Sequence, residues 1–179
     1  MTRISFRCMP LIVLVFLVAI TASSLSPPAS ALAQDMVTVS AGTSLLVKMQ
    51  SAVVTGEAKK GDHFTAVLEK SVTVDGKTVF HMGAKATGLV LEAVEKGNIS
   101  GHPALGIYLV EIETASGTAS IKTLSQGFVG TSEGTVNRIT AGAVVGQAGH
   151  GISVDASGQV AIKSGAMVEF NLVDPVEIH

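Results

Sequence analysis

The fold of this chain is decided by the stretch Val72-Thr73-Val74-Asp75-Gly76-Lys77-Thr78-Val79-Phe80, in which Asp-Gly separates two runs of strand-forming residues. A two-residue type I′ turn needs positive φ at both central positions, and Asp and Gly tolerate that conformation better than most residues. The stretch therefore predicts an antiparallel β-hairpin with its turn at Asp75 and Gly76.

Apolar and polar residues alternate in segments on both sides of this hairpin. In residues 44–50, three apolar side chains share one face, while Lys48 and Gln50 share the other. The same alternation recurs in residues 167–173. A period of two is typical of a strand with one buried face, so both segments are predicted to be strands.

A third segment is apolar on both faces. If it alternates strictly, Ile107 and Leu109 point one way, and Tyr108, Val110 and Ile112 point the other way. Strands that are covered on both faces read as continuous apolar runs. This segment is therefore predicted to be a central strand of a sheet.

Three glycines stand at the same place relative to a predicted strand. Gly42, Gly83 and Gly165 each follow an apolar residue by three positions and precede a small residue and an alternating segment. Glycine adopts positive φ without steric cost, so each is predicted to form a turn that leads into a strand. Several short strands with such turns predict an all-β fold, either a small antiparallel sandwich or a partly open barrel.

The first 33 residues have the pattern of a cleavable signal peptide. Arg3 and Arg7 give a positive start, Met9–Ala22 is apolar and uncharged, and small-x-small sequences end at Ala31 and Ala33. These 14 apolar residues are fewer than the roughly 20 that a membrane-spanning helix needs. We therefore expect cleavage after Ala33, export to the periplasm or the medium of a bacterium, and no stable transmembrane span in the mature chain.

Cleavage would leave residues 34–179 as a single domain. It removes two of the 12 basic residues and none of the 14 acidic residues, so the net charge falls from −2 to −4 with the histidines neutral. This balance argues against a nucleic-acid partner. The only cysteine, Cys8, leaves as well, so the mature chain has neither a disulfide nor thiol chemistry.

The order of four short motifs resembles a known kind of domain. Ala41–Thr43, Gly61–Ala66, the Asp75-Gly76 turn and Gly83–Gly88 follow one another as in an exported β domain of many uncharacterised bacterial envelope proteins. More distantly, they resemble the C-terminal domain of the TrbI family of conjugative transfer and type IV secretion proteins. The resemblance covers about half of the chain and implies an envelope protein as partner.

Residues 139–152 are rich in glycine and alanine. Gly142 and Gly146 have the small-xxx-small spacing that lets helices approach closely in membranes. The segment has 14 residues and includes Gln147 and His150, so it is too short and too polar to span a bilayer. It is predicted to be a flexible connection, and a self-associating or interfacial segment is the alternative.

Residues that could carry catalysis or bind a metal are sparse. The five histidines have neither His-x-His nor His-x-x-x-His spacing, and they are His63, His81, His102, His150 and His179. Without cysteine the usual zinc sets are missing, so no metal and no cofactor are expected. Asp62 beside His63 suggests a hydrolytic pair, but no Gly-x-Ser-x-Gly motif is present to supply a nucleophile.

Three functions are compatible with these patterns. The first is a noncatalytic envelope module that contacts another protein or a second copy of itself, which predicts an uncovered strand edge or apolar patch. The second is a binder of a small ligand or peptidoglycan fragment in a barrel mouth, which predicts an open interior. The third is a hydrolase, which predicts at least two of Asp62, His63, His81 and His102 beside a nucleophile. We expect the first, which is not an enzyme.

Overall fold

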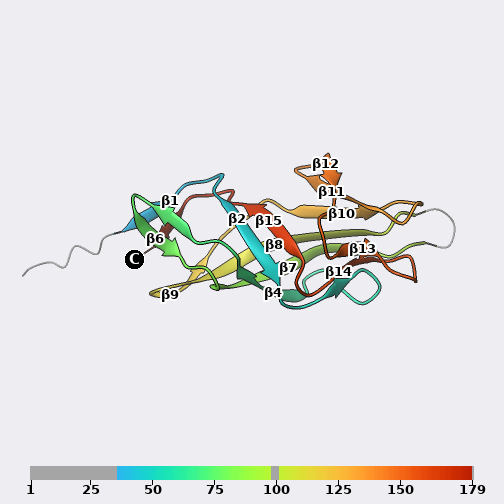
Figure 1. Cartoon of the computed structure of the whole chain (residues 1–179), viewed down its shortest axis with the longest axis horizontal. Coiled ribbons are helices and arrows are strands. Elements are labelled where there is room, and N and C mark those ends of the chain that lie inside the picture. Colours follow the sequence, from blue (N-terminus) through green and yellow to red (C-terminus); the bar gives the residue numbers. More distant parts are fainter. Residues whose placement is uncertain (1–35, 98–100, 179) are drawn as a thin grey trace, which may run out of the picture. The chain divides into compact units, whose positions relative to one another are not determined.

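The computed structural model describes residues 36–97 and 101–178, all within the unit Gln34–His179. The predicted signal peptide, residues 1–33, and His179 lie outside the described residues. The described part consists of strands and turns without α-helix (Figure 1). Within it, no helix has the length and hydropathy needed to cross a bilayer. The predicted all-β class is confirmed.

The strands follow one another along the chain with short connections. They are β1 (Val37–Val39), β2 (Ser44–Met49), β3 (Val53–Val54), β4 (His63–Leu68), β5 (Val72–Val74), β6 (Lys77–Phe80), β7 (Lys85–Val94), β8 (Ala104–Thr114), β9 (Gly117–Ser120), β10 (Gln126–Gly130), β11 (Val136–Thr140), β12 (Ala143–Gln147), β13 (Ile152–Val154), β14 (Val160–Ile162), β15 (Met167–Asn171) and β16 (Val176–Ile178).

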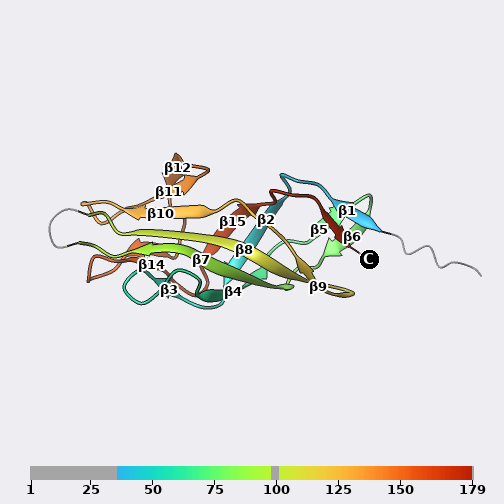
Figure 2. The same ribbon diagram turned by 180° about the vertical axis from the view of Figure 1, so that it is seen from behind.

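One large antiparallel sheet organises the domain. Its strands run in the order β12-β11-β10-β8-β7-β4-β2-β15, and β9 pairs with β8 beside this path. The sheet curls strongly into a half-barrel, with the small sheet β13-β14-β3 beside β10 and β11 (Figures 1 and 2). Of the two predicted architectures, the partly open barrel is therefore the one that forms. β8 lies between β7 and β10, as predicted for a central strand.

Alternation along the strands sends one set of side chains into a common core. In β2 and β4 every second residue is buried. The largest fully buried side chains include Phe64, Phe80, Phe128 and Phe170, which belong to one hydrophobic cluster. These rings fill the interior of the half-barrel.

The predicted turns have the backbone conformation that their residues favour. Asp75 (φ 50°) and Gly76 (φ 81°) connect β5 to β6. Gly42, Gly83 and Gly165 have φ values of 82°, 85° and 87°, and they precede β2, β7 and β15. Positive φ is costly for residues with a Cβ, so these positions favour glycine.

Ile112 does not share a face with Tyr108 and Val110. It is fully buried, whereas those two side chains are only half-buried. The cause is a register shift in the pairing of β7 with β8, between Thr87 and Gly88, which inserts an extra residue on β8. A bulge of this kind exchanges the faces beyond it, so the strict alternation assumed for this strand was wrong.

Residues 139–152 are not a flexible connection. They contain the end of β11, a tight turn at Ala141 (φ 50°) and Gly142 (φ 80°), the whole of β12 and the start of β13. The pairing of β11 with β12 has a bulge between Arg138 and Ile139. Glycines and a bulge hide the period of two, which explains why the prediction of a connection was wrong.

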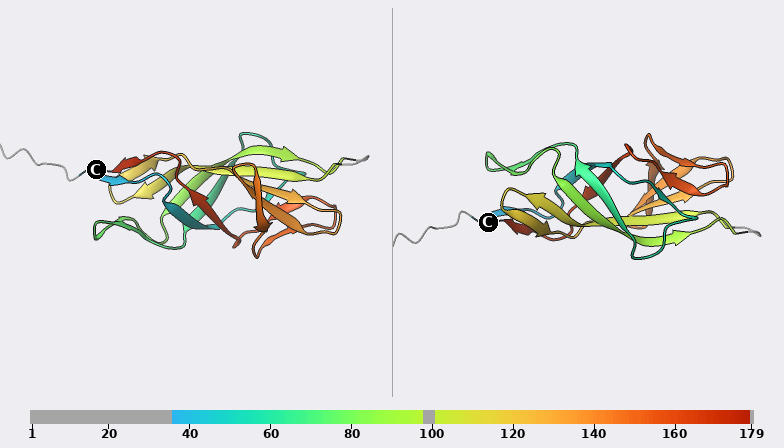
Figure 3. Two further views of the ribbon diagram at one scale, coloured as in Figure 1. Left: turned by 90° about the horizontal axis from the view of Figure 1, so that it is seen from above. Right: turned by 90° about the horizontal axis from the view of Figure 1, so that it is seen from below.

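The first and last strands of the described chain lie side by side. β1 pairs antiparallel with β16, and Val37 lies opposite Ile178. The β5–β6 hairpin and β9 lie at this same end of the domain (Figure 3). Residues 96–97 and 101–103 and the loops that follow β10 and β13 lie at the other end.

Candidate functional sites: a bare sheet edge and a loop-end cavity

The outermost strand of the large sheet, β12, has one open side. It pairs with β11, and no other strand of the described residues pairs with it. All five of its residues are exposed, including Val144 (65% exposed) and Val145 (49% exposed). β12 thus shows unpaired backbone groups and apolar side chains to solvent together.

The orientation of the β12 backbone follows from the ladder beside it. The N–H of Ala148 donates to the carbonyl oxygen of Val136 on β11, at 2.8 Å. Neighbouring residues of an antiparallel strand direct their backbone groups to opposite sides, so the N–H and C=O of Gln147 point away from β11. β12 carries no charge and no proline, which are common means of blocking an edge. The bulge is the one protective device present on this edge.

A hollow of about 200 Å³ lies on the sheet face beside this edge. Its lining includes Gly106 on β8 and Gly127 on β10, which are direct cross-strand partners. Leu91 on β7 and Ile139 on β11 add apolar surface, and Glu92 adds a carboxylate. Leu91 is 41% exposed. The apolar character of β12 therefore continues across the neighbouring strands.

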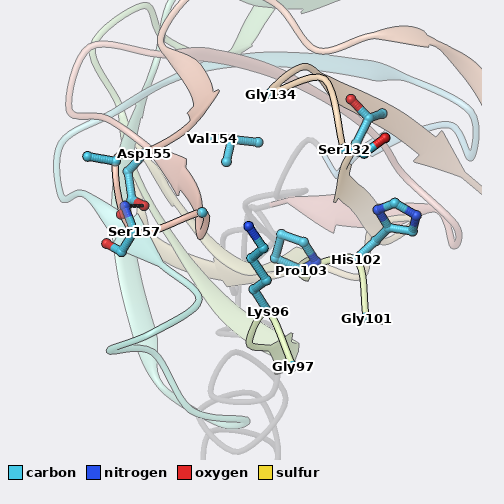
Figure 4. Close-up of a pocket in the computed structure, with 13 residues that line it drawn as sticks. Lys96, Gly97, Gly101, His102, Pro103, Ser132, Gly134, Val154, Asp155 and Ser157 are labelled. Carbon is cyan, nitrogen blue, oxygen red and sulfur yellow. Dashed lines mark hydrogen bonds between the residues drawn. The ribbon is translucent and has the colours of Figure 1, made fainter. Parts of the chain in front are cut away.

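The second candidate is a cavity of about 650 Å³ at the loop end of the domain (Figure 4). Residues from three parts of the chain line it, and they are Lys96, Gly97, Gly101, His102, Pro103, Thr131, Ser132, Gly134, Val154, Asp155, Ala156, Ser157 and Gly158. Cavities of this size are typical of small-molecule sites. Its lining combines one cation, one anion, one imidazole and several hydroxyls with apolar groups.

The backbone of Lys96 is anchored by the side chain of Gln159. Its N–H donates to Oε1 of Gln159 at 3.2 Å, and the buried Thr55 donates its hydroxyl to the same oxygen at 2.7 Å. The Lys96 side chain then passes over Gly158, where an added Cβ would lie 2.6 Å from Cδ and 2.9 Å from Nζ. Glycine at position 158 therefore makes room for this lysine.

The Asp155 carboxylate accepts hydrogen bonds from the turn in which it lies. Its Oδ1 accepts hydrogen bonds from the N–H groups of Ser157 and Gln159, each at 2.9 Å. The N–H of Gln159 is the main cause that lowers the pKa of Asp155; partial burial acts in the opposite direction, and Ser157 and Gly158 lower it further. The carboxylate is therefore ionised at neutral pH, and it stabilises the turn at Asp155–Gly158.

The candidate hydrolytic residues are dispersed. Asp62 accepts a hydrogen bond from the N–H of Lys59 at 2.8 Å, and it lines a small hollow with His63. His81 lies in the β6–β7 turn, and His102 lines the loop-end cavity. Within residues 36–97 and 101–178, no group of three or more His, Cys, Asp or Glu side chains could hold a metal ion.

Comparison with known proteins identifies no relative. No family model matches the chain. No curated protein matches it either. The resemblance to exported β domains and to the TrbI family therefore stays a prediction.

Sequence reasoning did not single out the residues that define these two places. Val144 and Val145 fell within the segment predicted to be a connection, although self-association was its alternative. Lys96 and Gln159 gave no local signal, because their contact joins positions 63 residues apart.

Proposed function

We propose that this protein is a noncatalytic, exported module of the bacterial cell envelope that acts by pairing its β12 edge with another protein or a second copy of itself. The observation that supports this proposal is the uncharged, fully exposed strand β12 at the end of the large sheet. The predicted signal peptide supports export to the periplasm or the medium.

The physical basis is strand addition. An extended segment placed beside β12 would gain main-chain hydrogen bonds from outward groups such as those of Gln147, and side-chain contacts would set its specificity. Val144 and Val145 would lose apolar exposed surface, worth about 25 cal/mol for each Å² removed from water. The hollow above Gly106 and Gly127 offers a place for an incoming apolar side chain.

The test is site-specific photocrosslinking in the envelope of a bacterial host that makes the full chain with its leader. A benzophenone amino acid replaces Val145 in one strain and Lys122 in another. Lys122 is the control because its side chain is also exposed (69%), but it lies beside the opposite edge of the sheet. We expect adducts from position 145 in the periplasmic or secreted fraction and far fewer from position 122.

A second variant tests whether the adducts depend on the β12 edge or on nonspecific adhesion. Val144→Lys places a charge on β12, which should suppress the adducts from position 145 while leaving the domain folded. Equal adducts from positions 145 and 122, no adducts at all, or cytoplasmic retention of the chain would contradict the proposal. The mass of the adduct distinguishes a second copy from another protein.

A further inference from the structure

We propose that the loop-end cavity is a binding site for a small molecule that carries one carboxylate together with hydroxyl or amide groups, as fragments of peptidoglycan do. This proposal rests on the cavity alone and is independent of the β12 edge. It names Lys96 as the group that recognises the carboxylate.

Lys96 offers a positioned and uncompensated positive charge. Its side chain reaches into the cavity (Figure 4), and its backbone is anchored through Gln159 to the buried Thr55. In the part of the chain that the structure describes, Lys96 makes no ion pair within 4.0 Å. Oδ1 of Asp155 accepts hydrogen bonds from its own turn, and this carboxylate forms no ion pair with Lys96. A ligand carboxylate would supply the missing charge-assisted hydrogen bond.

The other walls indicate what the rest of the ligand should be. His102 and Ser132 come from the loops after β7 and β10 and line the side away from Asp155 (Figure 4). They supply hydrogen-bonding groups, while Pro103, Val154 and Ala156 supply apolar surface. Such a mixed lining suits a sugar or a short peptide better than an entirely apolar molecule.

The Asp155 carboxylate restricts the ligand further. It is ionised at neutral pH and lies on the same wall as Ser157, so a second negative group placed there would be repelled. A hydroxyl or amide N–H in that position would instead donate to it. The cavity therefore favours a single carboxylate near Lys96 and neutral donors near Asp155.

The test compares two probes that differ in charge alone. N-acetylmuramic acid has one carboxylate with hydroxyl and amide groups, and its methyl ester has the same skeleton without the charge. Binding to the domain, residues 34–179, is followed by the backbone amide signals of Gly134 and Gly158 in nuclear magnetic resonance spectra, with each probe at up to about 50 mM. We expect the acid to shift these signals and to bind about tenfold more tightly than its ester.

Two substitutions assign the effect to Lys96. Lys96→Gln should weaken binding of the acid about tenfold and bring it to the level of the ester, whereas Lys96→Arg should preserve most of the affinity. Lys122→Gln, a change of an exposed lysine elsewhere, should have no effect. Thermal unfolding of each variant checks that the fold is intact.

Three outcomes would overturn the proposal: no shift with the acid, equal binding of acid and ester, or unchanged binding in Lys96→Gln. Each of these results leaves the β12 edge untouched. Crosslinking from position 145 in a Lys96→Gln chain should proceed as in the parent, so failure of one proposal can be told from failure of the other.

Discussion

The two edges of the large sheet differ in what the chain places beside them. At the last residue of β15 and just past it, residues 122–124 pair with residues 171–173, with Thr123 bridging to Leu172. The N–H of Leu124 donates to the carbonyl of Asn171, and the N–H of Val173 donates to the carbonyl of Lys122, each at 2.8 Å. Beyond β12, no strand of the described chain follows.

The side chains of the two edge strands differ in the same sense. On β15, Val168 and Phe170 are buried and Glu169 places a charge on the outer face. On β12 every residue is exposed and none is charged. One edge strand is thus bridged at its C-terminal end and contributes to the core. The other contributes little to the core, and no strand of the described residues pairs with its outer side. We therefore expect β12 to add little to the stability of the fold.

The largest effect should come from breaking the closed edge. Phe170→Ala removes a fully buried ring from β15 and should lower the free energy of unfolding by about 3 to 5 kcal/mol. Val144→Ala on the open edge is the matched comparison and should change it by less than about 0.5 kcal/mol. Urea denaturation measures both values. Similar losses in the two variants would show that β12 is part of the core after all.

A smaller effect should come from the segment that bridges to the end of β15. The buried Thr123 hydroxyl accepts a hydrogen bond from the N–H of Leu109 at 2.9 Å. Thr123→Val keeps the shape but leaves that N–H without its acceptor, so we expect a loss of about 1 to 3 kcal/mol. Thr118→Val, at an exposed position on β9, is the control and should be close to neutral. An equally small effect at position 123 would mean that residues 121–124 are loosely held.

The smallest effect concerns a turn at the loop end, which belongs to neither edge. Because the folded-state pKa of Asp155 is lowered, its carboxylate stabilises the fold above its unfolded pKa of about 3.9, and this contribution is lost as the pH falls through the folded value. Asp155→Asn should therefore be less stable than the parent at pH 7, and the difference should disappear in acid. Urea denaturation at a series of pH values tests this. A difference that persists at low pH would assign the effect to the turn geometry instead of the charge.

The features that could be predicted from sequence are those with local causes. Asp75 and Gly76 have a conformational preference of their own, and the alternation in residues 44–50 needs only the geometry of one strand. These signals were sufficient for an all-β fold, with the sandwich and the partly open barrel as alternatives. They also placed the glycine turns correctly in front of β2, β7 and β15.

The features that were missed depend on pairing or on distant contacts. Ile112 changes face because of a bulge, which is set by how β7 and β8 pair and has no marker in a single strand. β12 contains Gly146, at φ 134°, and follows Gly142, so its strand propensity is low. The loop-end cavity brings together Lys96, Ser132 and Asp155, which lie far apart in the sequence and share no local pattern.

The pairing of β1 with β16 determines how the domain responds to force. Val37 and Ile178 are partners, so a pull on both ends would open this pair from its free end and load its hydrogen bonds one after another. Bonds that break in sequence resist far less than bonds sheared together. A pull on both ends would therefore separate β1 from β16 first, and the large sheet would bear the force only afterwards.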